Sequence, residues 1–481
     1  MYNKKSALIS MKRRTFIQNA TLLTAGAFAS KFSFAQEHSF PTVRTPKEKR
    51  LFSSKVVEDA IAEFQKNTKN KELAWLFNNC FPNTLDTTVF PYVQNGRNYT
   101  YVITGDIDAM WLRDSSAQVW PYLPFMKKDK KLQDLIVGLI QKQSKCINID
   151  PYANAFYNDP TKKGEWFSDH TSMKPGIHER KWEIDSLCYP IRLAYHYWKE
   201  TNDSSPFNEE WLEAQHKIYQ TFVEQQRKDN LGPYKFERTT SRGSDTLQID
   251  GYGYPVNPVG LICSSFRPSD DSTIFSFLIP SNLFAIVSLR QAAEILKKVK
   301  NEQSLASKME ALAKEVEAAV NKYGIIDHPT LGKIYAFEVD GYSSHLMMDD
   351  ANIPSLLALP YLGAVDIHDE VYQRTRNFVL SEKNPFFFKG TAAEGIGGPH
   401  IGRDMIWPMS IIMRAQTSTN DEEIRNCIKT LVSTHGGTGF MHESFHKNDP
   451  KKFTRHWFAW TNTLFGELIW KIYKEKPSLL Q

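Results

Sequence analysis

Apolar residues recur at helical spacing along most of the chain after about residue 47. Leu305, Met309, Leu312 and Val316 follow a helical period, and residues 286–296 do the same immediately before them. The few polar residues between these two stripes predict an antiparallel helical hairpin. Similar stripes occupy residues 132–139, 211–222, 424–431 and 457–472. Asn208 precedes the second of them and is a candidate N-cap.

Strand patterns are few and short. Val89–Val93 and Asn98–Ile103 flank Asn95-Gly96, a dipeptide typical of tight β-hairpins. Residues 333–339 form another candidate strand. Strands and helices do not alternate regularly, which argues against a parallel α/β sheet. Many paired helices in one domain instead predict a mainly α fold, a helical toroid with a few short β-hairpins.

The first 35 residues have the features of an export signal. A basic region with Arg13-Arg14 is followed by a short apolar run, and Ser33-Phe34-Ala35 fits a cleavage site. The arginine pair followed by Phe16 indicates the bacterial twin-arginine type, although an ordinary secretory signal is an alternative. We therefore predict a signal at 1–35, a linker at 36–46 and one catalytic domain at 47–481, exported to the bacterial periplasm without stable membrane insertion.

Charge and cysteine content exclude several classes of protein. The chain carries +5, but residues 1–35 contain six Lys or Arg and no acid, so the remainder carries −1. A chain with this nearly neutral charge lacks the excess of Lys and Arg typical of proteins that bind nucleic acid or anionic lipid. The five cysteines are widely spaced and show no C-x-x-C motif, which predicts buried thiols with at most one disulfide.

Five stretches between the helical patterns are rich in Asp, Glu, Arg, His and aromatic residues. They are residues 104–115, 178–185, 267–271, 397–404 and 439–446, with Trp407 just after the fourth. Aromatic faces beside carboxylates suit a sugar, because the ring stacks while charged groups bind its hydroxyls. Loops of a helical ring converge on one mouth, so we expect a common pocket. The candidate sugar-binding residues are Asp108, Trp111, Arg113, Asp114, Asp185, Arg267, Asp271, His400, Arg403 and His442.

Two adjacent carboxylates, Asp270 and Asp271, stand out among these residues. Neighbouring carboxylates repel, so one of them tends to keep its proton and could serve as a general acid. The alternative is structural, with Ser269 or Asp270 capping a helix and Arg267 neutralising the pair. Glu443 could complete the chemistry by activating water on the opposite face of the sugar, as in an inverting glycosidase.

A zinc protease is a competing interpretation of the last polar stretch. His442-Glu443-Ser444-Phe445-His446 matches H-E-x-x-H, and Glu467 lies downstream as a possible third ligand. That chemistry requires both histidines on one face of a helix. Glycines before the motif and Asn448-Asp449-Pro450 after it make a helix unfavourable, so we expect no metal here.

Three motifs together resemble glycoside hydrolase family 125. They are residues 105–115 (GDIDAMWLRDS), 266–271 (FRPSDD) and 441–445 (MHESF). The similarity extends from about residue 51 to 473. It implies an (α/α)6 barrel and a metal-independent, exo-acting, inverting α-1,6-mannosidase without cofactors. By this resemblance Asp270 matches the general acid and Glu443 the general base, with a one-residue shift to Asp271 left open.

The resemblance also implies a mannose-containing oligosaccharide as the substrate, and we expect a monomer. Two alternatives remain open from the sequence. Another inverting helical-barrel enzyme, such as an α-glucosidase, would use the same carboxylates. A non-catalytic sugar-binding protein would have lost the acid or the base, yet Asp270, Asp271 and Glu443 are all present.

Overall fold

The computed structural model describes residues 40–481, and residues 42–481 form one compact unit. The predicted export signal and residues 36–39 of the predicted linker lie outside the described residues. Helices dominate and strands are short, which confirms the predicted mainly α fold. Between residues 40 and 481, no helix combines the length and apolar character needed to cross a membrane.

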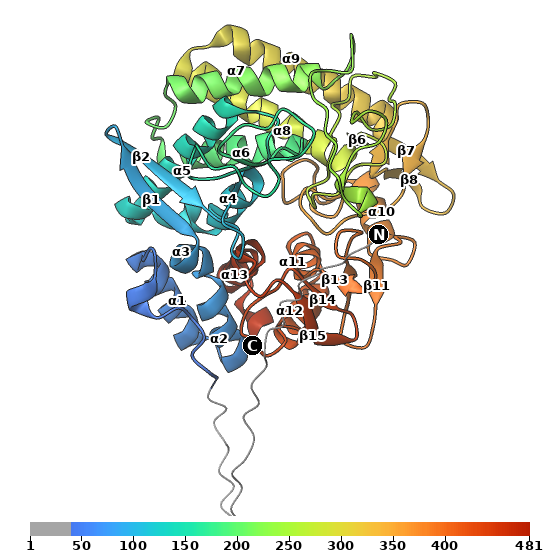
Figure 1. Cartoon of the computed structure of the whole chain (residues 1–481). Coiled ribbons are helices and arrows are strands. Elements are labelled where there is room, and N and C mark those ends of the chain that lie inside the picture. The colour runs from blue at the N-terminus through green and yellow to red at the C-terminus, as the bar shows by residue number, and fades with distance from the viewer. Residues whose placement is uncertain (1–39) are drawn as a thin grey trace, which may run out of the picture. The chain divides into compact units, whose positions relative to one another are not determined.

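The helices, labelled in Figure 1, form an inner ring of buried helices and an outer ring of half-exposed ones. The inner helices are α4 (Leu112–Val119), α6 (Ile184–Thr201), α8 (Ile279–Ile295), α11 (Pro408–Gln416) and α13 (Ala459–Glu475). The outer helices are α1 (Lys55–Asn67), α2 (Lys71–Cys80), α5 (Lys130–Ile149), α7 (Glu209–Glu224), α9 (Gln303–Ala319), α10 (Glu370–Val379) and α12 (Asp421–Ser433), and α3 (Asn83–Thr87) is a short connector. Helix α4 packs against α6 and α13, and α6 also packs against α8.

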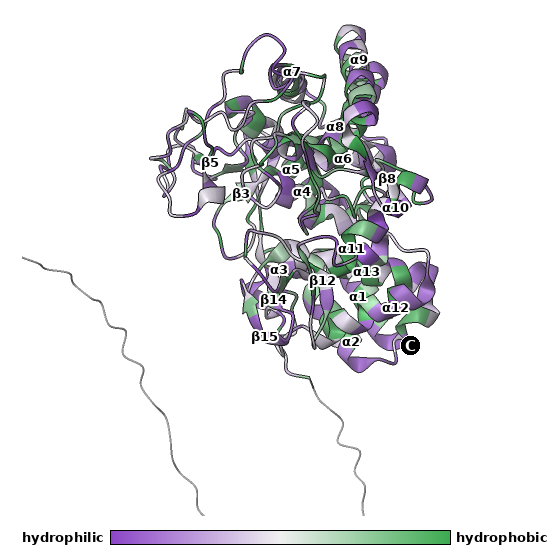
Figure 2. Ribbon diagram, turned by 90° about the vertical axis from the view of Figure 1, so that its right-hand side faces the viewer, coloured by the Kyte–Doolittle hydropathy of each residue, from purple (hydrophilic) through white to green (hydrophobic). Residues whose placement is uncertain are grey.

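Side-chain chemistry explains which ring each helix joins. Every residue of α4 is buried, and so are most residues of α6, α8 and α13. Outer helices such as α9 bury one apolar stripe and expose a charged face, visible as mixed colours in Figure 2. The predicted hairpin of residues 286–323 is confirmed as the α8–α9 pair. Asn208 caps α7 as predicted, because its Oδ1 accepts a hydrogen bond from the Trp211 amide at 3.0 Å.

The remaining inner position, the fourth along the chain, is filled by residues 351–362, which lie between α9 and α10 and are almost entirely buried but form no regular helix. Pro354 and Pro360 interrupt the segment, and proline removes a helical donor. Its backbone is held by side chains instead. The Tyr189 hydroxyl of α6 donates to the Ile353 carbonyl at 3.2 Å, and the Tyr372 hydroxyl of α10 donates to the Leu357 carbonyl at 2.9 Å.

The strands form small sheets at the ends of the helices. Three sheets have three strands: β3 (Met110–Trp111), β4 (Ala155–Phe156) and β5 (Ile177–Glu179); β6 (Phe277–Leu278), β9 (Glu338–Val339) and β10 (His345–Leu346); and β13 (Met405–Ile406), β14 (Ser444–His446) and β15 (Asp449–Thr454). The pairs are β1 (Val89–Gln94) with β2 (Arg97–Val102), β7 (Ile325–His328) with β8 (Gly332–Tyr335), and β11 (Phe387–Lys389) with β12 (Glu394–Ile396). The β1–β2 pair confirms the hairpin predicted at Asn95-Gly96.

The polar stretches found in the sequence lie just before the N-termini of the inner helices. Residues 104–111 precede α4, 178–183 precede α6, 266–278 precede α8, 398–407 precede α11 and 441–458 precede α13. All inner helices therefore start at one mouth of the toroid. The partial positive charge of helix N-termini favours carboxylates there. The five cysteines lie away from this chemistry as buried free thiols (Cys80, Cys146, Cys188, Cys263 and Cys427).

Candidate active site

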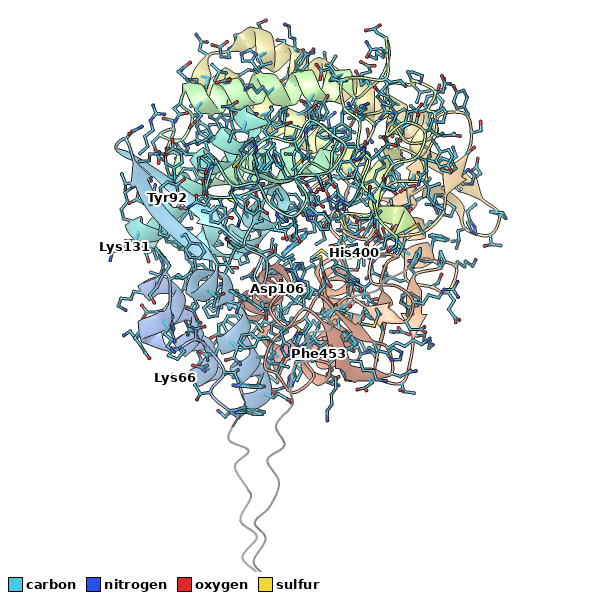
Figure 3. All side chains as sticks on the ribbon, in the orientation of Figure 1. Lys66, Tyr92, Asp106, Lys131, His400 and Phe453 are labelled. Atoms are coloured by element: carbon cyan, nitrogen blue, oxygen red, sulfur yellow. The ribbon has the colours of Figure 1, made fainter. Side chains whose placement is uncertain are left out.

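A narrow cavity opens where four of the five polar stretches meet residues 351–362. Its lining residues are Thr104, Ile107, Trp111, Arg113, Asp114, Pro268, Ser269, Asp270, Asn352, His400, Trp407, Glu443, Arg455, Phe458 and Trp460. Every inner position except that of α6 contributes lining side chains. In Figure 3, Asp106 and His400 lie near the centre of the molecule, whereas Lys66 and Lys131 lie at its edge. The cavity combines carboxylates, a guanidinium group and aromatic faces, which is the predicted composition of a sugar site.

The loop before α8 separates the two adjacent carboxylates. The Arg267 amide donates to the Asp271 carbonyl at 2.7 Å, which closes a tight turn. Asp270 has φ +69°, a left-handed conformation that Asp tolerates better than most residues. Its side chain lines the cavity and is 26% exposed. The Asp271 side chain is only 3% exposed, does not line the cavity and lies beside His400, with Nδ1 3.5 Å from Oδ1.

Cations and an amide surround Asp270. The Asn154 amide donates to its Oδ1 at 3.3 Å, and Arg113 Nη2 lies 3.8 Å from the same oxygen. The Lys181 ammonium donates to its backbone carbonyl at 2.8 Å. Burial favours the neutral acid, but the charges of Lys181 and Arg113 outweigh it, so the pKa of Asp270 lies below its ordinary value.

Glu443 reaches the cavity from the opposite part of the ring, immediately before β14. The Thr454 hydroxyl donates to its Oε2 at 2.9 Å, and Arg455 Nη1 lies 3.7 Å from its Oε1. Thr454 ends β15 and Arg455 follows it, so the hairpin of β14 and β15 carries the carboxylate and both of its neighbours. This geometry holds the Glu443 carboxylate in a fixed orientation.

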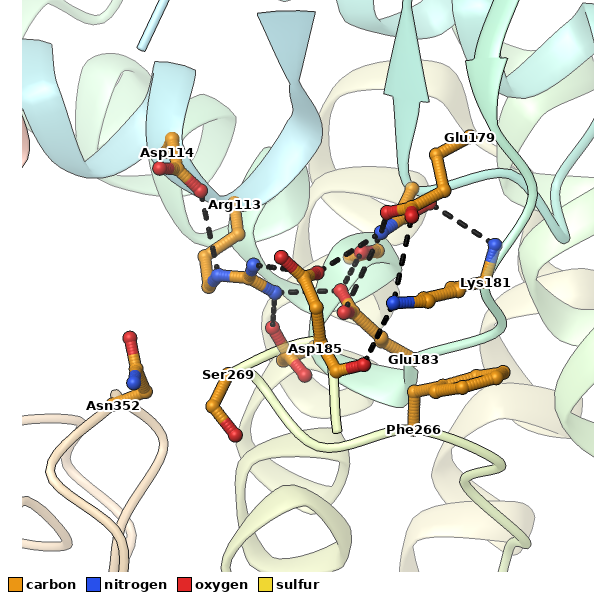
Figure 4. Close-up of polar contacts among 12 residues, drawn as sticks. Arg113, Asp114, Glu179, Lys181, Glu183, Asp185, Phe266, Ser269 and Asn352 are labelled. Carbon is orange, nitrogen blue, oxygen red and sulfur yellow. Dashed lines mark hydrogen bonds and ion pairs between the residues drawn. The ribbon is translucent and has the colours of Figure 1, made fainter. Parts of the chain in front are cut away.

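Arg113 connects several buried carboxylates (Figure 4). Its Nη1 donates to Glu183 Oε2 and, at 3.1 Å, to Asp185 Oδ2, while Nε lies 3.4 Å from Asp114 Oδ2. Asp114 and Asp185 stand in the first turns of α4 and α6, where the helix dipole favours an anion. Burial raises the pKa of Asp114 to about 6 despite the neighbouring Arg113.

Of the predicted sugar-binding residues, the cavity brings together Trp111, Arg113, Asp114 and His400. Burial opposes the charge of His400, but the adjacent Asp271 outweighs it and raises the pKa of the imidazole. These residues accompany Asp270 and Glu443, so half of the predicted site residues line one cavity.

Six predicted residues do not line the cavity, for different reasons. Asp185 and Asp271 are buried behind it. Arg267 Nε donates to Glu338 Oε1 at 2.6 Å, and this bond holds the loop that carries Asp270 against β9. Asp108 and Arg403 are on the surface, and Lys162 Nζ lies 3.5 Å from Asp108 Oδ2. His442 stacks on Phe453 with ring centroids 3.7 Å apart.

The zinc-protease interpretation requires a helix that the structure does not form. Ser444–His446 is strand β14, so His442 and His446 do not share a helical face. Burial lowers the pKa of His442 to about 4, and its Nε2 lies 3.0 Å from the Thr438 hydroxyl. Glu467 accepts hydrogen bonds from Trp120 and Tyr361 in another part of the protein.

The sequence interpretation missed Asn154, Glu183, Asn352 and Arg455 as site residues. Glu183 was inside a polar stretch already singled out, so its charge density was a usable signal. Arg455 follows a short strand, Asn352 comes just after Asp349 and Asp350, and Asn154 lies between two alanines. Asn352 and Arg455 line the cavity, whereas Asn154 and Glu183 are buried behind it next to Asp270.

A toroid of paired helices whose loops converge on carboxylates and tryptophans is the architecture of an α/α-barrel glycoside hydrolase. A family model described as metal-independent alpha-mannosidase (GH125) matches residues 70–470. This chain therefore belongs to glycoside hydrolase family 125, and the predicted family is confirmed.

Individual relatives agree with this assignment. A Streptococcus pneumoniae metal-independent alpha mannosidase, solved as a non-productive complex with alpha-1,6-mannobiose, is 41% identical with a TM-score of 0.85, over 89% of this chain and all of the other. This match confirms the (α/α)6 fold. A Saccharomycopsis fibuligera glucoamylase shares the fold alone, at 12% identity and TM-score 0.53, over 86% of this chain and 96% of its own.

A named relative corrects one prediction. The meiotically up-regulated gene 157 protein of the fission yeast Schizosaccharomyces pombe is 42% identical over 90% of this chain and 88% of its own length. The predicted bacterial periplasmic location is wrong by this comparison, because so extensive a match is to a eukaryotic protein. Residues 1–35, on which the prediction depended, lie outside the described residues.

Proposed function

We propose that this α-mannosidase is an exo-acting, inverting enzyme that releases mannose from α-1,6-linked mannosides. Asp270 is the general acid that protonates the glycosidic oxygen. Glu443 is the general base that removes a proton from the attacking water. The catalytic domain is residues 47–481, acting as a monomer.

The observation that carries this proposal is the placement of the two carboxylates in the ring. The inner positions follow the chain as α4, α6, α8, residues 351–362, α11 and α13. Asp270 precedes α8, the third position, and Glu443 precedes α13, the sixth. Positions three and six of a six-membered ring face each other across the axis. Inversion requires an acid on one face of the sugar and a base with its water on the other.

The rest of the cavity supports a terminal sugar as the ligand. Side chains from five of the six inner positions line the cavity. A cavity enclosed in this way suits the end of a glycan better than an internal segment. The α-1,6 linkage is supported by the ligand of the pneumococcal neighbour. The family match favours mannose over glucose, so the α-glucosidase alternative has no observation of its own.

The test is to follow hydrolysis of α-1,2-, α-1,3- and α-1,6-mannobiose by NMR in the first minutes of reaction. We expect the α-1,6 substrate to be cleaved fastest and the new sugar to appear first as β-mannose. Initial release of α-mannose would overturn the inverting mechanism, and preference for another linkage would overturn the proposed specificity.

A further inference from the structure

One amide serves three carboxylates behind the proposed acid. The Asn154 side-chain nitrogen lies 3.3 Å from Asp270 Oδ1, 3.2 Å from Glu179 Oε2 and 3.5 Å from Glu183 Oε1. An amide nitrogen carries only two hydrogens. Its two hydrogens cannot serve three ionised carboxylates at once. A proton on one of the three groups removes one negative charge from this shared contact.

The charge balance of the surrounding network leads to the same conclusion. Its ion pairs connect the carboxylates of Asp114, Asp169, Glu179, Glu183, Asp185, Asp245 and Asp270 with the cations of Arg113, Lys181 and Arg238, while the imidazoles of His178 and His400 face the same cluster. Carboxylates outnumber the permanent cations, and all but Asp245 and Asp270 are buried. Burial penalises uncompensated charge, so the cluster retains protons at neutral pH.

Glu183 is the group best placed to hold a proton next to Asp270. Its Oε2 accepts hydrogen bonds from Arg113 and, at 2.9 Å, from the Ser186 hydroxyl. Oε1 has only the long contact with the shared Asn154 amide. Burial and the adjacent Asp270 raise the pKa of Glu183 well above its ordinary value, although Arg113 opposes the shift, and the two carboxyl groups interact directly. These contacts favour the proton on Glu183 over Asp270.

We propose that Glu183 is a positioning residue that shares one proton with Asp270 and keeps it available to the general acid at neutral pH. The inference rests on the proposed function. Glu183 passes the shared proton to Asp270, which gives it to the glycosidic oxygen as the bond from that oxygen to C1 breaks, and the bonding electrons stay with the oxygen. The water oxygen bonds to C1 while Glu443 takes a proton from that water. Glu443 then releases this proton to solvent and the Glu183–Asp270 pair takes one up, so the cycle closes without net change.

The test compares Glu183→Gln, Glu183→Asp and wild type in pH profiles of kcat/KM for α-1,6-mannobiose. Glutamine keeps the shape of the side chain but has no proton to share, so Asp270 is left with its cations and loses its proton at lower pH. In the pH profile, the fall of kcat/KM on the alkaline side (the alkaline limb) should move by about one pH unit or more toward lower pH. At a given pH on that limb, kcat/KM should then be about tenfold lower than in wild type. Aspartate, which keeps a titrating group, should restore part of the shift.

Two further variants separate proton sharing from a structural role. Ser186→Ala removes a donor from the Glu183 carboxylate, so the alkaline limb should move the other way, toward higher pH. Asp169→Asn, which breaks the ion pair with Arg238 in the same network, should lower the melting temperature without moving the limb. If Glu183→Gln does not fold, the direction of the Ser186→Ala shift decides.

The inference would be overturned if the alkaline limb of the kcat/KM profile stayed at its wild-type pH in both Glu183→Gln and Ser186→Ala. Equal losses for mannobiose and for an activated aryl α-mannoside at every pH would do the same, since proton donation matters less for a good leaving group. Asp270→Asn tests the proposed function separately. If it shows a leaving-group-dependent loss while the Glu183 variants leave the limb unmoved, only the shared proton is refuted.

Discussion

Arg455 Nη1 lies 3.7 Å from Glu443 Oε1 at the wall of the cavity. The guanidinium is anchored on its other side, because Nε donates to Asp106 Oδ1 at 2.8 Å and Nη2 to the Thr104 hydroxyl at 3.3 Å. The loop before α4 and the loop before α13 thus fix the surroundings of the proposed base together. This anchor gives the cation a defined position beside the carboxylate, which the Thr454 hydroxyl also holds.

Arg455→Met should reduce kcat/KM for mannobiose by about tenfold to a hundredfold. A hydrogen-bonded or ion-paired charged group contributes about 1.5–3 kcal/mol, and 1.4 kcal/mol corresponds to tenfold. Methionine keeps the apolar stem but removes the charge and the link to Asp106. Lys452→Met, an exposed position on β15, is the matched control and should retain wild-type rates. Steady-state kinetics of both variants make the measurement, and an unaffected Arg455 variant would contradict the role.

Asp270→Asn should reduce hydrolysis of mannobiose severely and that of an activated aryl α-mannoside much less. General acid catalysis contributes about 10²–10⁴-fold, and a good leaving group needs less protonation. Asp271→Asn should show no such dependence on the leaving group, because Asp271 is buried beside His400. Measuring both substrates with both variants checks the assignment. The reverse pattern would move the acid to Asp271 and leave the mechanism intact.

Asp349 should make folding less favourable as pH rises. Burial raises its pKa to about 8, although the amides of Leu356 and Leu357 hydrogen-bond to it. The folded protein therefore holds a proton that the unfolded chain releases near pH 4. Its contribution to the free energy of unfolding is complete below about pH 4 and is lost as pH rises toward 8, by up to about 1.4 kcal/mol per pH unit.

The check is urea denaturation of wild type and Asp349→Asn at several values between pH 4 and 8. Asparagine does not titrate, so the stability difference in favour of wild type should shrink as pH rises. A difference that stays constant across this range would show that Asp349 does not change its protonation on unfolding.

Gly105 should tolerate no side chain. Its φ is +129°, and an added Cβ would lie 2.2 Å from the Trp457 carbonyl oxygen, where the loops before α4 and α13 form a bridge. Gly105→Ala should lower the free energy of unfolding by about 1–3 kcal/mol or more, the usual cost of such strain. Gly243→Ala, with open space around it, should be neutral. Thermal and urea unfolding compare the two, and equal stabilities would refute the tight contact.

Activity should survive prolonged treatment with a strong chelator. The family is described as metal-independent, and the helix required by the H-E-x-x-H chemistry is replaced by β14. Metal analysis of the purified protein should be combined with mannobiose hydrolysis before and after chelation. Stoichiometric zinc, with activity lost on its removal and regained on its return, would contradict this prediction.

Local patterns predicted local structure reliably in this chain. The stripe from Leu305 onward, the cap at Asn208 and the hairpin at Asn95-Gly96 each depend on neighbouring residues, so their physics is contained in short segments. The charged stretches also marked five of the six loops at the cavity, because inner helices of a toroid start at one mouth. The fourth inner position, residues 351–362, was missed because its prolines remove the helical pattern.

The sequence by itself determined the helical class, the carboxylates available for chemistry and, through three motifs, the family. Only the tertiary structure shows that Asp270 lines the cavity and Asp271 does not, since one left-handed residue turns the first into the cavity and leaves the second behind it. It also brought Arg455 to Glu443 and Glu183 to Asp270. Those relationships join loops from different parts of the ring, and they exist only once the ring has closed.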